Sequence, residues 1–82
     1  MPNKLRALSS KELIKFLEKN GFVSYSCHGS HAKLKRIIGN STQTLIVPIR
    51  REIAKGTLRG IYDQILGYLP ESAELKNLFF TD

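Results

Sequence analysis

The sequence is poor in cysteine and contains no long apolar run. Cys27 is the single cysteine, which excludes an internal disulfide and a cysteine-rich metal cluster and favours a reducing cytoplasm. No stretch approaches the ~20 apolar residues of a membrane span, and the N-terminus lacks a signal peptide's apolar core. Phosphate-binding loops, paired-carboxylate sites, dinucleotide fingerprints and internal repeats are also missing. We therefore expect a soluble cytoplasmic protein with no membrane association.

The length sets the number of domains. With 82 residues and 41% hydrophobic content, residues 1–82 are expected to form a single domain. A domain of this size buries roughly 60–65% of the surface of its unfolded chain. The chain has no room for a second domain.

The net charge of +6 is unevenly distributed along the chain. Residues 31–36 contain three basic side chains and no acidic one, and residues 50–59 contain four basic side chains and one acidic one. From residue 62 onward the sign reverses, with four acidic side chains against one basic. This asymmetry favours a polyanionic ligand on one surface. The alternative is a solvated basic face that has no partner.

Local signals predict two main helices. Ser9 and Glu12 form a capping box before an apolar stripe, and Asn20-Gly21 is a stop signal, so a helix is predicted over 10–19. A second helix is predicted with Thr57 as its N-cap and its end near Gly67. Its expected core-facing side chains are Leu58, Ile61, Tyr62, Ile65, Leu66 and Leu69. A short C-terminal helix is predicted to begin with Pro70 at its first position. Its expected docking face is Leu75, Leu78, Phe79 and Phe80.

Three strands are predicted between these helices. They cover residues 22–27, 32–38 and 43–47, and Pro48 ends the last of them. Turn signals at residues 28–30 and 39–41 separate them, which predicts an antiparallel meander. The expected fold class is α+β, in which the helices cover one sheet face and leave the other wet.

The most informative segment is the turn at residues 29–31 and the strand after it. Gly29 supplies the backbone freedom of a tight turn, and His31 follows at its rim. A period of two places His31, Lys33 and Lys35 on one face of the strand. Ala32 and Leu34 then point to the core, and Arg36 falls on their side. The pattern predicts a proton-transfer group beside phosphate-binding charges.

The order of these motifs resembles one known family, the HicA toxins of bacterial toxin–antitoxin pairs. The matching segments are Lys19–Phe22, Gly29–His31, Val47-Pro48 and Lys55–Arg59. The resemblance covers about residues 5–69 and implies a fold like the double-stranded-RNA-binding domain. It also implies RNA cleavage that depends on His31, and a HicB-type antitoxin partner that covers the active surface. Ser26 and Cys27 stand where many members carry Arg-Gln, and Ile49-Arg50 stands where many carry a basic residue and a histidine.

The expected function is therefore that of a metal-independent mRNA endoribonuclease toxin with no cofactor. His31 is the predicted general base for the RNA 2′-hydroxyl, a role that contributes ~10²- to 10⁴-fold. The predicted RNA-binding residues are Ser30, Lys33, Lys35, Lys55 and Arg59, beside the motif glycine Gly29. Lys33 and Lys35 would stabilise charge on the phosphorus centre. The general acid is left open among His28, a lysine and solvent.

Other hypotheses remain open at this point. Cys27, His28 and His31 lie close enough in sequence to raise a metal site, but an extended strand points the first two to opposite faces and no further Cys or His completes a ligand shell. A non-catalytic RNA-binding module would bind RNA and leave it uncut. A domain whose ligand is an acidic protein would bind no RNA.

Overall fold

The first helix begins and ends where its local sequence predicts. The computed structural model describes residues 4–81, and α1 spans Ser10–Lys19. The Ser9 hydroxyl oxygen accepts a hydrogen bond from the Glu12 backbone N–H at 3.1 Å and lies 3.2 Å from the Glu12 carboxylate. After the helix, Gly21 adopts a φ of 96°, a left-handed conformation that glycine tolerates without a steric penalty.

The three predicted strands form an antiparallel sheet. They are β2 (Val23–His28), β3 (His31–Ile38) and β4 (Ser41–Pro48), in the order β2-β3-β4. Gly29 and Gly39 take φ values of 58° and 59°, and within residues 4–81 only glycines have a positive φ. A glycine with positive φ at the first central position is typical of a type II′ hairpin turn. Because these turns are tight, pairing extends further toward them than predicted and β3 begins at His31.

Helix α2 (Lys55–Leu66) starts earlier than predicted. Its N-cap is Ala54, and Thr57 lies inside the first turn, so the assignment of Thr57 as N-cap is wrong. The cause is tertiary, because the buried Ile53 donates its N–H to the Leu8 carbonyl at 2.9 Å and anchors the chain just before the helix. Gly67 caps the other end, as predicted. Leu66, expected in the core, is 38% exposed.

The C-terminal helix is present but starts later than expected. α3 spans Ala73–Phe79, and the Ser72 hydroxyl caps it by accepting the Leu75 N–H at 3.1 Å, so Pro70 lies outside the helix. The chain then continues into β5 (Phe80–Thr81), which pairs with β1 (Lys4–Leu5). This short ladder was not predicted, because it joins the two ends of the described chain.

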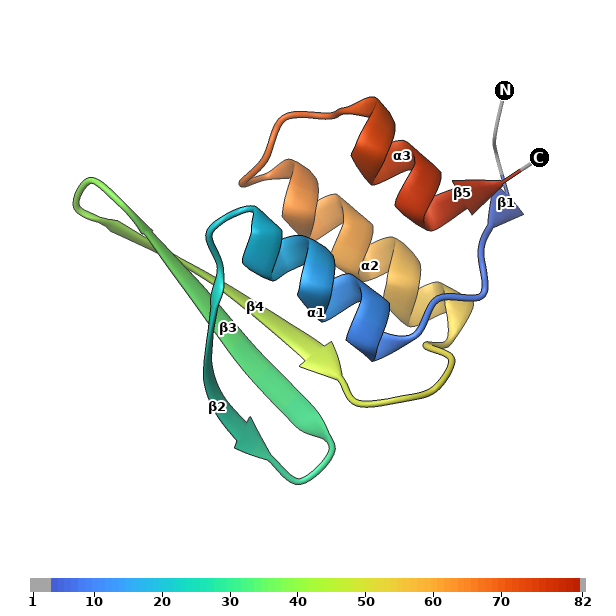
Figure 1. Cartoon of the computed structure of the whole chain (residues 1–82), viewed down its shortest axis with the longest axis horizontal. Helices are drawn as coiled ribbons and strands as arrows, with labels where there is room; N and C mark the ends of the chain where they lie inside the picture. The colour runs from blue at the N-terminus through green and yellow to red at the C-terminus, as the bar shows by residue number, and fades with distance from the viewer. Residues whose placement is uncertain (1–3, 82) are drawn as a thin grey trace.

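The elements stack in layers on one side of the sheet. Helices α1 and α2 lie over one sheet face, and α3 lies beyond them (Figure 1). The core contains Leu13 and Leu17 from α1, Leu34 from β3, and Leu58 and Ile65 from α2. The opposite sheet face is open to solvent, as the alternation in β3 predicts. The fold is thus α+β, with a helix, a three-stranded antiparallel sheet, a second helix and a short C-terminal helix. No helix within 4–81 has the length and apolar character to cross a membrane.

Candidate functional site

A hollow forms where the ends of β3 and β4 meet the start of α2. Its volume is about 360 Å³. The side chains that line it are His31, Ile46, Pro48, Arg50, Ile53, Ala54 and Thr57. It joins the sequence-predicted histidine to the loop between β4 and α2. No acidic side chain of the described residues belongs to its lining.

The turn that carries His31 is tied to the end of β4. His31 and Pro48 are register partners in the β3–β4 ladder. Beside this pair, on the side of the turn, the Ile49 N–H donates to the Ser30 carbonyl at 2.6 Å. The left-handed Gly29 lets the hairpin reverse within two residues, so that the turn reaches this edge. The position of His31 is therefore set by main-chain hydrogen bonds on both sides.

The His31 side chain is exposed and lies beside the Ser30 hydroxyl. Its Nδ1 lies 3.4 Å from the Ser30 hydroxyl oxygen, a long contact whose donor depends on the tautomer. When Nδ1 carries the proton and donates a hydrogen bond to the Ser30 hydroxyl oxygen, Nε2 holds the free lone pair. That tautomer leaves a proton acceptor facing solvent, as a general base requires.

Arg50 is a site residue that sequence reasoning missed. Its backbone N–H donates to the Ser10 hydroxyl at 3.0 Å, and its carbonyl accepts from both the Ser10 hydroxyl and the Ser10 N–H at 3.0 Å. Its guanidinium contacts the Ile49 carbonyl at 3.0 Å and remains largely exposed at the hollow. The sequence signal for Arg50 is the basic run at residues 50–59, in which the family resemblance points to Lys55 and Arg59 but not to Arg50.

The start of α2 contributes a second source of positive potential. Among residues 4–81, no side chain caps its first turn, so the amide groups of that turn are available to an anion. Ala54 and Thr57 bring this turn into the wall of the hollow. Lys55 and Arg59 lie one turn apart on the same helix and do not line the hollow. Arg59 also forms an exposed ion pair with Asp63 at 3.6 Å.

Lys33 and Lys35 lie on the open face of the sheet, outside the hollow. Both are half-buried, while Ala32 and Leu34 between them are 6% and 0% exposed. The predicted alternation along β3 is thus confirmed. Lys35 places its ammonium nitrogen 4.0 Å from the centroid of the Tyr25 ring. The structure places His31 and Arg50 in the lining of one hollow and the two lysines farther along β3.

Arg36 points the opposite way and has a structural role. Its guanidinium donates to the Asn20 carbonyl at 3.1 Å, the Tyr68 carbonyl at 3.0 Å and the Gln43 side chain at 2.8 Å. It also lies over the Phe22 ring, with 5.2 Å between its Cζ atom and the ring centroid. These contacts tie β3 to the ends of α1 and α2 and hold the Arg36 guanidinium away from the open face of the sheet.

The other residues with possible metal or redox chemistry do not gather. Cys27 is exposed, and His28 is the register partner of His31 across the hairpin. In the part of the chain that the structure describes, no three His, Cys, Asp or Glu side chains come together as a metal-binding group.

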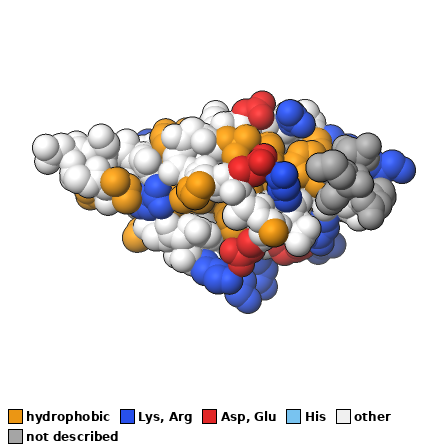
Figure 2. Space-filling model, turned by 90° about the horizontal axis from the view of Figure 1, so that it is seen from above, with side chains coloured by type: hydrophobic (Ala, Val, Ile, Leu, Met, Phe, Trp, Pro, Cys, Tyr) orange, Lys and Arg blue, Asp and Glu red, His pale blue; other side chains and the backbone are white. Residues whose placement is uncertain are grey.

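Three acidic side chains in the C-terminal half of the described chain form ion pairs with lysine or arginine. The ion pairs are Lys19 with Glu74 at 2.7 Å, Lys76 with Glu71 at 3.2 Å, and Arg59 with Asp63. Figure 2 shows acidic and basic side chains interspersed on the face it presents. None of these pairs includes Arg50, Lys33 or Lys35. The positive charge around the hollow and along β3 is therefore uncompensated by ion pairs within residues 4–81.

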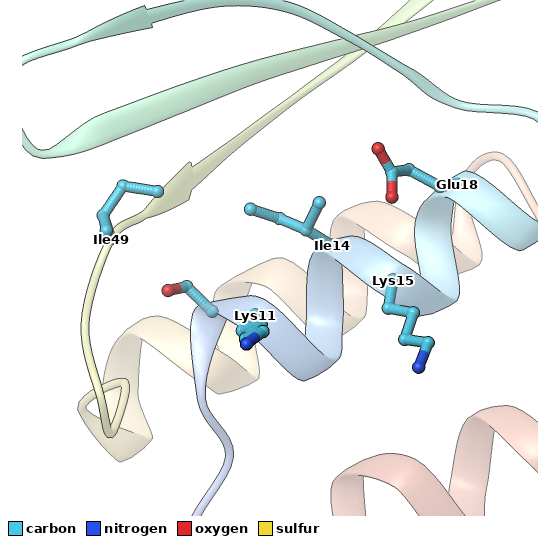
Figure 3. A pocket seen from close by; sticks show the side chains of 6 residues that line it. Lys11, Ile14, Lys15, Glu18 and Ile49 are labelled. Carbon is cyan, nitrogen blue, oxygen red and sulfur yellow. The ribbon is translucent and has the colours of Figure 1, made fainter.

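A second hollow lies between α1 and the end of β4. It has a volume of about 510 Å³ and is lined by Ser10, Lys11, Ile14, Lys15, Glu18 and Ile49. Ile14 and Ile49 face each other across it (Figure 3). It contains none of the predicted site residues.

Comparison with protein families identifies the group to which this chain belongs. The model of the family described as HicA toxin of bacterial toxin-antitoxin matches residues 10–66, which is more than half of the chain. The chain belongs to the HicA toxin family. The matched region includes α1, the three-stranded sheet and α2, so it contains His31, Arg50 and every predicted RNA-binding residue. No match was found among curated proteins or solved structures. Membership of the HicA family indicates a toxin of a toxin–antitoxin pair and implies a cognate antitoxin partner.

Proposed function

We propose that this chain is a cytoplasmic mRNA endoribonuclease, the toxin of a type II toxin–antitoxin pair, with His31 as its general base. The observation that carries the proposal is the exposed His31 imidazole in one hollow with Arg50 and the N-terminus of α2. This hollow combines a proton acceptor with fixed positive potential. Those are the two requirements for cleaving a phosphodiester through its own 2′-hydroxyl.

The proposed reaction uses an internal nucleophile. Nε2 of His31 removes the proton from the ribose 2′-oxygen, which attacks the adjacent phosphorus. The bond from phosphorus to the 5′-oxygen breaks, and that oxygen takes up a proton from the general acid, a lysine or solvent, and leaves as a hydroxyl group. The products are a 2′,3′-cyclic phosphate and a 5′-hydroxyl end. Neither a bound water nor a metal ion is needed to supply the nucleophile.

Charge stabilisation comes from two sides of the hollow. The pentacoordinate phosphorus centre gains negative charge on its nonbridging oxygens as the 2′-oxygen attacks. The Arg50 guanidinium offers paired N–H donors that match a phosphate edge. The first-turn amides of α2 add donors whose orientation is fixed before the substrate binds. Lys33, Lys35, Lys55 and Arg59 hold phosphates on either side of the cut.

The test is cleavage of an end-labelled RNA in EDTA by the full chain, His31→Ala and His28→Ala. His28 is the matched control, because it is the second histidine of the same hairpin but does not line the hollow, and we therefore assign it no role as general acid. We expect cleavage by the parent and by His28→Ala, with cyclic phosphate ends, and none by His31→Ala. Equal cleavage by all three proteins would remove His31 from the mechanism. RNA bound by the parent but left intact would instead identify a non-catalytic RNA-binding module.

Two further measurements extend the test. Expression of the parent chain is expected to arrest growth, and coexpression of the antitoxin or the substitution His31→Ala is expected to relieve the arrest. Single-stranded RNA binding through Z phosphate contacts weakens with salt at a slope of about −0.7Z on a log–log plot. A flat salt response of RNA binding would contradict phosphate contacts by the lysines and arginines named above.

A further inference from the structure

The open face of the sheet carries large apolar side chains beside its lysines. Val23 and Tyr25 on β2 are each 67% exposed, and Ile37 on β3 is 73% exposed. Val23 is the register partner of Lys35, so the two lie side by side on this face. A cluster of exposed apolar side chains is typical of a surface that binds a partner.

Tyr25 lies two residues after Val23, at an irregularity in the sheet. The β2–β3 register shifts between Ser24 and Ser26, and Tyr25 has no paired residue on β3. A bulge of this kind leaves one residue of its strand unpaired. Tyr25 lies against Lys35, whose ammonium nitrogen is 4.0 Å from the ring centroid. The exposed aromatic ring thus lies next to a cation that the core does not use.

We propose that Tyr25 is a stacking platform for an unpaired RNA base, with Lys35 and Lys33 binding the flanking phosphates. This inference rests on the proposed function and identifies its substrate as single-stranded RNA. Aromatic rings interleaved with cations are the composition of surfaces that bind single strands, because every base has a face that can stack. A base inside a duplex has both faces covered by its neighbours and cannot use the ring.

The distance along β3 links this platform to His31. His31 and Lys35 are four residues apart on the same face, which corresponds to ~13 Å at ~3.3 Å per strand residue. Stacked nucleotides are spaced by ~3.4 Å along one strand, so this span equals about four of them. A base held on Tyr25 thus places a phosphate a few nucleotides away at the hollow.

The lysines on this surface also make its composition unlike that of the centre of a protein–protein interface. Interface cores are depleted in lysine, whereas Lys33 and Lys35 stand in the middle strand of this sheet. No ion pair within residues 4–81 neutralises either one. An RNA strand supplies both a partner for the ring and counter-charge for the ammonium groups.

The experiment measures RNA binding by the full chain carrying His31→Ala, so that the probe is not cut. The probe is a fluorescent RNA, used single-stranded and annealed to its complement. Into this background we introduce Tyr25→Leu, which removes the ring and keeps apolar volume, and Tyr25→Phe, which keeps the ring. Ile38→Ser is the matched control, because Ile38 is an apolar side chain that is 51% exposed but lies at the far hairpin.

We expect Tyr25→Leu to weaken single-strand binding by ~5- to 100-fold and to change duplex binding little. Tyr25→Phe and Ile38→Ser should bind like the His31→Ala background. Unchanged binding by Tyr25→Leu, with RNA cleavage by the wild type intact, overturns the platform and leaves the proposed function standing. Absence of both RNA binding and RNA cleavage overturns the proposed function itself. Loss of antitoxin binding by Tyr25→Leu, with unchanged RNA binding, assigns this face to the protein partner and overturns the proposal.

Discussion

Ser10 forms three hydrogen bonds with the backbone of Arg50. The Ser10 hydroxyl both donates to the Arg50 carbonyl and accepts from the Arg50 N–H, and the Ser10 N–H donates to the same carbonyl, each at 3.0 Å. Ser10 is 5% exposed and is the one buried polar residue among those the structure describes. The first residue of α1 thereby sets the position of a basic residue in the candidate site.

Ser10→Ala should reduce both stability and activity. The substitution leaves the Arg50 N–H without a partner, which lowers the free energy of unfolding by about 1–3 kcal/mol. It also loosens the loop that carries Arg50, so RNA cleavage should fall at temperatures where the variant remains folded. Ser9→Ala is the control: it removes a helix cap at a cost of about 0.5–2 kcal/mol and should leave cleavage by the folded protein unchanged. Urea unfolding and labelled-RNA cleavage measure the two effects. Unimpaired cleavage by folded Ser10→Ala would show that this clamp does not position Arg50.

Arg50→Ala should reduce RNA cleavage by about 10²-fold or more, because it removes a donor to the developing negative charge. Its side chain is exposed, so the free energy of unfolding should change by less than about 0.5 kcal/mol. The neighbouring exposed Arg51, which does not line the hollow, is the control residue. If Arg51→Ala reduces the rate as much as Arg50→Ala does, the effect is one of overall charge rather than of this site.

Arg36→Met and Lys35→Met should separate the two faces of β3. Arg36→Met removes charged donors to two main-chain carbonyls, and we expect the free energy of unfolding to fall by about 2–3 kcal/mol. Lys35→Met should change stability little and weaken RNA binding. Unfolding curves and RNA titrations on both variants test this contrast. A greater loss of stability from Lys35→Met than from Arg36→Met would reverse the assignment of the faces.

Tyr62 predicts a loss of stability at alkaline pH. Burial, reinforced by the nearby Glu71 carboxylate, raises the pKa of the Tyr62 phenol above its ordinary value of 10.0. Above pH 10 the unfolded chain therefore releases this proton while the folded chain retains it, so the free energy of unfolding falls as pH rises. Tyr62→Phe should make that decline shallower, although it loses the hydrogen bond to Glu71 at 3.3 Å. Urea unfolding at neutral pH and above pH 10 measures the slope. Identical slopes for the two proteins would show that Tyr62 does not contribute.

The local features of the fold follow from short-range rules. The alternation of exposed and buried residues in β3, the cap at Ser9 and the hairpin at Gly29 each depend on a few adjacent residues. All three were predicted correctly. The errors at Thr57 and Pro70 both occur at helix starts. The start of α2 is set by the hydrogen bond between Ile53 and Leu8, which is distant in sequence, and the start of α3 is set by the cap at Ser72. The catalytic role of His31 stays a prediction until RNA cleavage is measured.

Periodicity, turn glycines and family motifs were enough to assign the fold class and to single out His31, because each acts through neighbours along the chain. These signals did not predict that Arg50 and His31 line the same hollow. It depends on the β3–β4 register and on a hydrogen bond between residues 40 positions apart. The separation of Arg36 from Lys35 also depends on contacts up to 32 positions away. Such contacts form only when the layers pack, since core burial places in one hollow side chains that no local pattern connects.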